Sequence, residues 1–213
     1  MNKKFIREAA FRGGDAMQKL ASFHATIAGV GTLGSNLADT LSRQGFQRLR
    51  LIDMDRVEEH NVSTQIFGMD DIGALKVDAA KNLIYANVEI EVETHNKRID
   101  QKQIKKLFKG TDLVVDALDN STSRLLLRDF CRDNGVPCLH VGMFEGYGEV
   151  VWNDVYNVPN DVDGDVCDVP LARNLAMIAV SIAAEEIVDF VTAEHPRLES
   201  RSITLSDLKI SMY

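Results

Sequence analysis

The sequence predicts an α/β fold with a doubly wound, mainly parallel sheet and antiparallel strands near the C-terminus. Apolar, β-prone runs alternate with helical patterns over the first two thirds of the chain, as in proteins whose parallel strands are linked by helices. A glycine-rich turn joins the first of these runs to the first helical pattern. Residues 147–158 then alternate polar and apolar side chains, which is typical of an antiparallel strand.

Each expected element follows from its residue pattern. Short apolar runs predict strands at residues 26–30, 48–53, 89–96, 113–117 and 138–143. Apolar residues at helical spacing predict helices at residues 35–44, 75–86, 101–108, 121–134 and about 171–191. A helical segment is expected within residues 1–22, a loop at 159–170, and a closing strand or hairpin at 200–213. No repeat or long linker interrupts the series, so one domain is expected over residues 1–213.

The glycines after the first strand carry the strongest functional signal. They are spaced G-x-G-x-x-G at Gly29, Gly31 and Gly34, between an apolar strand and a helical pattern. This spacing permits a tight turn, close backbone approach to a phosphate and close packing of helix on strand. The helix N-terminus then offers free N–H groups to an anion. Asp53 follows about twenty residues later, where a carboxylate can accept a hydrogen bond from a ribose hydroxyl. A Rossmann-like nucleotide-binding site is therefore predicted.

Composition and charge exclude several classes of protein. The chain has 213 residues and a formal net charge of −8, and its lysines and arginines are dispersed. Binding to nucleic acid or to an anionic membrane surface is therefore not expected. No apolar run approaches the ~20 residues that span a bilayer, and the first residues lack an apolar signal core, so a cytoplasmic protein is expected. Three cysteines without a C-x-x-C pair argue against a disulfide framework and a structural zinc site.

More polar residues follow strands at the same expected edge of the sheet. After the second strand come Asp55, Asn61, Gln65 and Lys76. The run LVVDALDN ends a later strand with Asp116, Asp119 and Asn120. Ligands bind at this edge of an open parallel sheet, where the strand order switches. A carboxylate there can hold Mg²⁺, while Lys76 and Arg43 can balance phosphate charge. These groups suit a polyphosphate better than hydride transfer.

In this order, the motifs resemble those of one known family. GVGTLG, LIDMDRVEEHN, Gln65, G-x-x-K-V-D-A and D-A-L-D-N are similar to motifs of the ThiF/MoeB/HesA family, in the ubiquitin-activating-enzyme (E1)-like adenylyltransferase superfamily. REAAFRG, which begins at Arg7, resembles the N-terminal R-Q-x-x-L-R-G segment of that family. The resemblance covers nearly the whole chain, including its apolar helix and closing strand, and implies a single adenylation domain.

The resemblance implies an enzyme that uses ATP to adenylate the C-terminal carboxylate of a small ubiquitin-like or sulfur-carrier protein ending in Gly-Gly, releasing pyrophosphate. Thioester or sulfur transfer is an optional following step. The implied ATP pocket consists of Gly29, Gly31 and Gly34 at the phosphates, Asp53 at the ribose, and Asp55, Asn61, Gln65 and Asn120 nearby. Arg43 and Lys76 would neutralise phosphate charge, and Asp119 would bind Mg²⁺. In homodimeric members an N-terminal arginine reaches the ATP of the partner subunit, which is the role expected for Arg7.

Two features depart from the family pattern. Members usually carry arginine immediately before Gln65, whereas this chain has Thr64. Loss of one phosphate-facing donor costs on the order of 10²-fold in rate. Either Arg43 or Arg7 then compensates, or the enzyme is slow, or the protein is an inactive nucleotide-binding scaffold. The paired C-x-x-C zinc ligands of many bacterial members are also missing, as in zinc-free members. An NAD-dependent oxidoreductase is the alternative from another enzyme class, because Asp53 would also suit NAD.

Cys167 has two interpretations. It lies where thioester-forming members place a catalytic cysteine, so a covalent role competes with that of an incidental loop thiol. The N-terminus of the following helix would favour its thiolate, whereas Asp165 and Asp168 would oppose it by like charge.

Other polar residues and cysteines are expected to have structural roles. Asp161, Asp163 and Asp165 miss the spacing of an EF-hand, so a solvated acidic loop is expected in place of a calcium site. Asp119 is preferred over Asp116 as the metal ligand, because the family resemblance places the metal there. The residues expected in the core are Cys131, Cys138 and His140.

Overall fold

The computed structural model of the protein describes residues 3–160, 170–196 and 198–212. Within these residues, eight strands form one sheet, namely β1 (His24–Ala28), β2 (Arg48–Ile52), β3 (Glu93–His95), β4 (Leu113–Asp116), β5 (Cys138–Phe144), β6 (Tyr147–Trp152), β7 (Arg201–Thr204) and β8 (Lys209–Met212). The α-helices are α1 (Ile6–Arg12), α2 (Gly14–Ser22), α3 (Thr32–Gln44), α4 (Lys76–Val88), α5 (Ile104–Leu107), α6 (Ser121–Asn134) and α7 (Arg173–Thr192). Short 3-10 helices are η1 (Lys3–Phe5), η2 (Glu59–Asn61) and η3 (Met69–Asp71).

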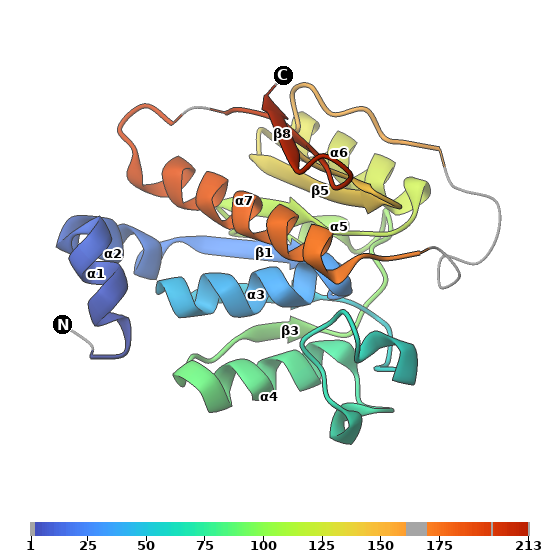
Figure 1. Ribbon diagram of the computed structural model, residues 1–213, viewed down its shortest axis with the longest axis horizontal. Helices are drawn as coiled ribbons and strands as arrows, with labels where there is room; N and C mark the ends of the chain where they lie inside the picture. Colours follow the sequence, from blue (N-terminus) through green and yellow to red (C-terminus); the bar gives the residue numbers. More distant parts are fainter. Residues whose placement is uncertain (1–2, 161–169, 197, 213) are drawn as a thin grey trace.

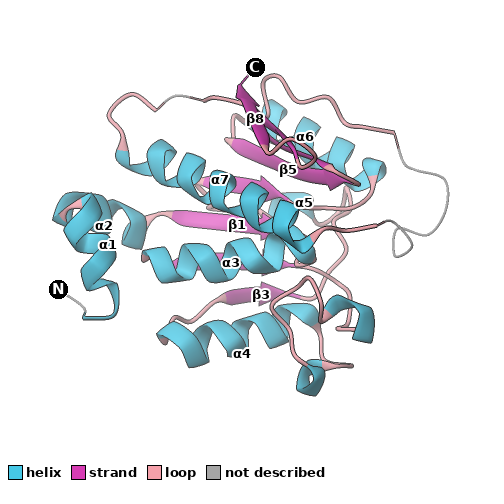
Figure 2. Cartoon of the chain, in the orientation of Figure 1, coloured by secondary structure: helices cyan, strands magenta, loops and turns pink. Residues whose placement is uncertain are grey.

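The strand order places the switch point of the sheet between β1 and β4. The order is β3-β2-β1-β4-β5-β6-β7-β8, with parallel pairing from β3 to β5 and antiparallel pairing from β5 to β8. The chain runs outward from β1 to β3, then crosses over to β4 and runs outward on the other side. Helices cover both faces of the sheet (Figures 1 and 2). The predicted fold class, doubly wound and mainly parallel with antiparallel C-terminal strands, is confirmed.

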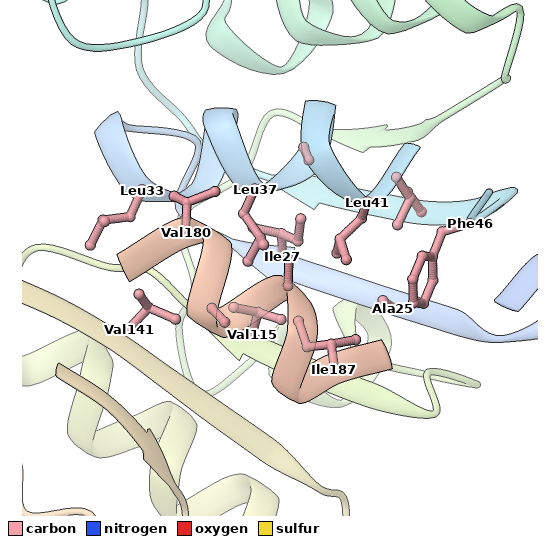
Figure 3. Packing of buried hydrophobic residues seen from close by; sticks show 14 of the residues in the cluster. Ala25, Ile27, Leu33, Leu37, Leu41, Phe46, Val115, Val141, Val180 and Ile187 are labelled. Atoms are coloured by element: carbon pink, nitrogen blue, oxygen red, sulfur yellow. The ribbon is translucent and has the colours of Figure 1, made fainter. Parts of the chain in front are cut away.

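Two hydrophobic cores hold the helices on the sheet. The larger core lies between one face of the sheet and α3, α4 and α7. In Figure 3, Leu37 of α3 and Val180 of α7 project toward Ile27 of β1. The smaller core lies on the other face under α5 and α6, and Ala28 faces it. Every residue of β1 is buried, because a central parallel strand is covered on both faces.

The ends of two helices follow from residues that the sequence places there. α6 begins after Asn120, whose Oδ1 accepts a hydrogen bond from the N–H of Ser123 at 2.9 Å. α3 ends at Gln44 and is followed by Gly45, whose φ of 105° suits a residue without a Cβ. The helix predicted at residues 121–134 is therefore confirmed to the residue.

Several predicted boundaries are wrong. The strand predicted at 89–96 is only Glu93–His95, because Glu89 adopts a left-handed conformation that ends α4. The helix predicted at 101–108 shortens to α5, and the strand predicted at 147–158 ends at Trp152. α3 begins at Thr32, three residues before its predicted start, so the helix begins directly at the glycine-rich turn. In the described residues, the N-terminal segment contains α1 and α2, and the end of the chain forms a hairpin of β7 and β8.

None of the helices formed by the described residues is both long enough and apolar enough to cross a membrane.

Candidate functional site

Two loops flank the switch point of the sheet. The glycine loop, residues 29–31, joins β1 to α3, and the 117–120 loop joins β4 to α6. The N–H of Gly29 donates to the carbonyl oxygen of Ile52, and that of Ala117 donates to the carbonyl oxygen of Ala28, each at 2.9 Å. Both loops therefore continue directly from hydrogen-bonded strands, at the edge toward which β1 points in Figure 1. Open α/β sheets bind ligands at this edge, beside the switch point.

Close packing explains two of the three glycines. A Cβ at Gly34 would clash with the carbonyl oxygen of Gly29, and a Cβ at Gly29 would lie 2.5 Å from the carbonyl oxygen of Ala117. Gly29 also has a φ of 89°, which L side chains rarely adopt. Gly31 differs, because a Cβ there would meet nothing within 4 Å. The backbone is therefore open at Gly31, where α3 begins.

The N-terminus of α3 is electrostatically unbalanced. Gly31 precedes the helix, and the first turn has neither a side-chain cap nor an acidic residue. The first N–H groups of a helix lack intrahelical acceptors, and the helix dipole places partial positive charge there. An anion at Gly31 would accept hydrogen bonds from these N–H groups and would balance the partial positive charge.

Asp53 ties the end of β2 to the glycine loop. Its Oδ2 accepts from the N–H of Val30 at 2.6 Å, and its Oδ1 accepts from the N–H of Asp55 at 2.8 Å. Burial raises the pKa of Asp53, and these two backbone hydrogen bonds counteract that rise. A carboxylate oxygen can accept more than one hydrogen bond. Asp53 can therefore hold the loop and still accept from a ligand hydroxyl.

Lys76 places a buried positive charge at the same edge. It is the first residue of α4 and is only 9% exposed. Its Nζ lies 3.2 Å from Oδ2 of Asp55, and its N–H donates to the carbonyl oxygen of Asp55 at 3.0 Å. Because an ammonium group has three donors, Lys76 can keep this pair and also bind an anion.

Asn61 and Gln65 differ in how their side chains are used. Oδ1 of Asn61 accepts from the N–H of Glu58 at 2.9 Å, so this buried side chain shapes the loop around η2. Gln65 is 8% exposed, and its Oε1 has no hydrogen-bond partner in the described part of the protein. Buried polar atoms are nearly always hydrogen-bonded. Gln65 therefore offers an acceptor to a ligand or to water.

The 117–120 loop presents Asp119 to solvent. Nδ2 of Asn120 donates to Oδ1 of Asp119 at 3.2 Å, which orients the carboxylate. Among the residues that the structure describes, no group of three or more His, Cys, Asp or Glu side chains is arranged to hold a metal ion. A single carboxylate still fits Mg²⁺, which commonly takes its remaining ligands from phosphates and water.

A buried ionic cluster beneath this loop was missed by the sequence analysis. It consists of Asp116, Arg124, His140, Asn153 and Tyr156. Oδ2 of Asp116 lies 2.7 Å from Nδ1 of His140 and 3.8 Å from Nη1 of Arg124. Nε2 of His140 lies 2.7 Å from Oδ1 of Asn153, and its ring stacks on Tyr156 with centroids 3.7 Å apart. Nη1 of Arg124 donates to the hydroxyl of Tyr156 at 2.7 Å.

The cluster fixes the 117–120 loop from below. Nε of Arg124 donates to the carbonyl oxygen of Leu118 at 2.7 Å, and the N–H of Leu118 donates to Oδ1 of Asp116 at 3.0 Å. Burial alone would raise the pKa of Asp116, but the Arg124 charge and the hydrogen bond with His140 hold it below its usual value. Burial raises the pKa of Tyr156 to about 12, although Arg124 opposes the rise. These residues therefore position the loop that carries Asp119.

The expected core residues are confirmed. His140 is fully buried and hydrogen-bonded on both ring nitrogens. Cys131 and Cys138 are buried free thiols in the smaller core. Burial raises the pKa of the Cys138 thiol well above its usual value, which disfavours a thiolate.

Two expected site residues lie away from the glycine loop of their own chain. Arg43 is in the last turn of α3, about 18 Å from the loop by helical rise, and its Nε lies 2.7 Å from Oδ2 of Asp39. It therefore cannot neutralise a phosphate at its own glycine loop, which corrects that expectation. Arg7 is on α1, at the end of the sheet opposite the one toward which β1 points (Figure 1). Cys167 and the aspartates at 161, 163, 165 and 168 lie outside the described residues.

Together the described residues place an uncapped helix N-terminus, the Asp53 carboxylate and the buried Lys76 at the carboxyl ends of the parallel strands. Residues 5–211 match the ThiF family. The chain belongs to the ThiF family. The family resemblance that the motifs predicted is therefore confirmed.

Relatives of this ThiF family member include named activating enzymes. The chain is 32% identical to the SAMP-activating enzyme E1 of Haloferax volcanii over 139 residues. This match covers 64% of this chain and 52% of that protein. The chain is also 32% identical to a probable adenylyltransferase/sulfurtransferase MoeZ of Mycobacterium tuberculosis over 146 residues. That match covers 67% of this chain and 37% of that protein. The chain thus spans about half the length of the first relative and just over a third of the second. Its fold is similar to that of E. coli MccB crystallised with ATP, with a TM-score of 0.84, 17% identity, and 100% of this chain and 71% of that chain covered.

Proposed function

We propose that this ThiF family chain is an adenylation domain that activates the C-terminal carboxylate of a small ubiquitin-like or sulfur-carrier protein. A carboxylate oxygen attacks the α-phosphorus of ATP, the bond from that phosphorus to the bridging oxygen breaks, and pyrophosphate leaves with the electron pair. The names of the SAMP-activating and adenylyltransferase relatives support this reaction type. The observation that carries the proposal is the uncapped N-terminus of α3 at Gly31, beside Asp53 and Lys76.

The residues at this edge of the sheet suit a nucleoside triphosphate on physical grounds. Gly31 leaves open space where a phosphate would approach the first N–H groups of α3. Asp53 would accept from a ribose hydroxyl, and Gln65 would accept from a donor of the bound nucleotide. Lys76 would stabilise the negative charge of the phosphates. Asp119 would hold Mg²⁺, which supplies further positive charge at the transferring phosphate.

The reaction opposes like charges, so neutralisation is its main physical requirement. An incoming carboxylate meets a triphosphate, and at 4 Å each pair of unit charges repels by about 4 kcal/mol at an effective dielectric constant of 20. A helix N-terminus, the buried Lys76 and an ion at Asp119 all act against this repulsion. None of these groups is required for hydride transfer.

Two finer parts of the proposal concern residues that act outside the described site. We propose a homodimer in which Arg7 contributes to the nucleotide site of the other chain, because α1 lies far from its own glycine loop. We also propose that Cys167 can accept the activated acyl group, with its thiolate attacking the acyl carbon and AMP leaving. Cys167→Ala should then retain adenylation and lose transfer. Full transfer by this variant would remove the covalent step.

Pyrophosphate exchange tests the central proposal. Small proteins ending in Gly-Gly that are encoded beside this gene are the partners to supply, and exchange of labelled pyrophosphate into ATP is the expected result. Asp119→Asn should lower exchange by about 10²-fold or more while leaving the melting temperature unchanged, since Asp119 is exposed. Thermal stabilisation by NAD(H) but not by ATP–Mg²⁺ would instead indicate an oxidoreductase. Binding of ATP without exchange for any such partner would indicate a scaffold.

A further inference from the structure

Thr64 joins the first turns of α3 and α7. Its carbonyl oxygen accepts from Nδ2 of Asn36 and from Nη1 of Arg173, each at 2.9 Å. Its hydroxyl lies 3.0 Å from that of Thr32, the first residue of α3. Nδ2 of Asn36 also donates to the carbonyl oxygen of Thr32 at 2.7 Å. The guanidinium of Arg173 is thus held beside the start of the helix that follows the glycine loop.

Arg173 carries a charge that the described protein does not neutralise. It is exposed and is the first residue of α7, and no described carboxylate lies within ion-pair distance of it. By contrast, Arg43 at the other end of α3 pairs with Asp39 at 2.7 Å. A cation at a helix N-terminus is unfavourable, because the dipole there is already positive. The first turn of α7 contains no acidic residue and no side-chain cap that would offset this.

Two uncapped helix N-termini and an unneutralised arginine therefore meet at position 64. Members of the family usually have arginine at that position, and here the Thr64 hydroxyl is engaged with Thr32. Arg173 uses Nη1 for the Thr64 carbonyl oxygen, and its Nε and Nη2 have no acceptor among the described residues. A guanidinium with two free donors on one edge binds phosphate oxygens in a bidentate manner.

We infer that Arg173 supplies the phosphate-facing cation whose usual position in this family is occupied by Thr64. The inference rests on the proposed ATP site, because it assigns Arg173 to the phosphates bound there. The Thr64 carbonyl oxygen orients the guanidinium, so a charge donated by α7 replaces a charge donated by the loop before Gln65. The start of α7 is then part of the nucleotide site.

Paired variants test the assignment by nucleotide binding as well as by exchange. Arg173→Gln should weaken ATP–Mg²⁺ binding by about tenfold or more and lower the kcat of exchange by on the order of 10²-fold. AMP binding should change much less, because AMP carries fewer phosphate charges for the guanidinium to contact. Arg48→Gln is the matched control, since Arg48 is also exposed and also donates through Nη1 to one carbonyl oxygen, that of Ser22 at 3.0 Å. Arg48 lies at the start of β2, at the opposite edge of the sheet, and its variant should behave as wild type.

Rescue distinguishes a phosphate contact from a structural one. Thr64→Arg introduced into the Arg173→Gln protein should recover at least tenfold of the lost exchange and ATP affinity, because it restores a guanidinium at the usual position. If wild type binds ATP–Mg²⁺ and Arg173→Gln binds it equally well, the inference is overturned while the proposed function stands. Equal loss of AMP and ATP affinity with a lowered melting temperature would likewise assign Arg173 a structural role. If wild type binds no adenine nucleotide, the proposed function itself fails.

Discussion

Nε of Arg124 donates a hydrogen bond to the carbonyl oxygen of Leu118 at 2.7 Å, so a buried side chain of α6 holds the loop that carries Asp119. The same guanidinium faces the fully buried carboxylate of Asp116. The stability of the fold and the geometry of the candidate metal ligand therefore depend on one arginine.

Replacing Arg124 should destabilise the protein strongly. Arg124→Met leaves Asp116 as a buried charge without its cationic partner, and loss of one member of a buried ion pair costs about 3–5 kcal/mol. The free energy of unfolding, measured by urea denaturation and circular dichroism, should fall by that amount. Arg128→Met is the control, because Arg128 pairs with Asp129 at the surface and should contribute less than about 1 kcal/mol. Similar losses for the two variants would show that the buried cluster contributes no more than a surface pair.

The contribution of Asp116 to the free energy of unfolding should decrease at low pH. Its pKa is lowered in the folded protein, so the unfolded chain binds a proton more readily than the folded protein does. The stabilisation from its charge is then present above the unfolded pKa of about 3.9. That stabilisation is lost as the pH falls toward the folded value.

Asp116→Asn removes this pH dependence and therefore tests whether folding lowers or raises the pKa of Asp116. The difference in free energy of unfolding between wild type and variant should be constant from pH 7 to about pH 5 and should shrink below that. The slope of this decline cannot exceed about 1.4 kcal/mol per pH unit for one group. Urea denaturation at a series of pH values measures it. A difference that grows on acidification would mean that the pKa of Asp116 is raised.

Alanine substitutions at two glycines should separate folding from nucleotide binding. A Cβ at Gly34 would clash with the carbonyl oxygen of Gly29, so Gly34→Ala should lower stability by about 1–3 kcal/mol and weaken ATP binding as well. A Cβ at Gly31 meets only open space, and its φ of −80° suits alanine. Gly31→Ala should keep stability within about 0.5 kcal/mol of wild type.

ATP affinity decides whether the open space at Gly31 is a phosphate position. If it is, the added methyl group of Gly31→Ala should weaken ATP binding by about tenfold, equivalent to 1.4 kcal/mol. Calorimetric titration with ATP–Mg²⁺ measures this, and thermal melting of the same sample checks the fold. Wild-type affinity in Gly31→Ala would place the phosphates elsewhere.

The sequence predicted those parts of the site that lie next to a strand. Gly29 directly follows β1 and Asp53 directly follows β2, while Gly31 and Gly34 come shortly after Gly29, so short-range pattern alone puts them at one edge of the sheet. Asp119 and Asn120 follow β4 for the same reason. The parallel topology of the sheet places these residues together, and the alternation of strands and helices in the sequence predicts that topology.

Contacts between distant segments could not be predicted in this way. Arg124 lies in the helical run STSRLLLRDF, where an arginine is expected to face solvent, and it turns inward because α6 packs on β4 and its guanidinium donates to the carbonyl oxygen of Val141 in β5. Arg173 and Thr64 are 109 residues apart and meet because α3 and α7 pack side by side. Arg43 was assigned to the phosphates although it lies near the C-terminal end of the helix predicted at residues 35–44, away from the glycine loop, and the structure confirms that position.

Mixing two inactive variants should test whether Arg7 acts across a dimer. Both residues are exposed, so Arg7→Ala and Asp119→Ala should each fold and each lose most exchange activity. In a mixed dimer, the Arg7→Ala chain keeps its own Asp119 and receives Arg7 from the other chain, which restores one of two sites. Random subunit exchange makes about half of the dimers mixed, so activity should rise from near zero to about one quarter of wild type.

The matched control carries both substitutions in one chain and is mixed with wild type. Each mixed dimer then has no complete site, because one chain lacks Asp119 and the other receives no Arg7. Activity of this mixture should fall on subunit exchange from about half to about one quarter of the all-wild-type value. If Arg7 served its own chain, the first mixture would stay inactive and the control would stay at one half. Native mass spectrometry on the same samples establishes that mixed dimers have formed, and a chain that remains monomeric while exchanging pyrophosphate would remove Arg7 from the site.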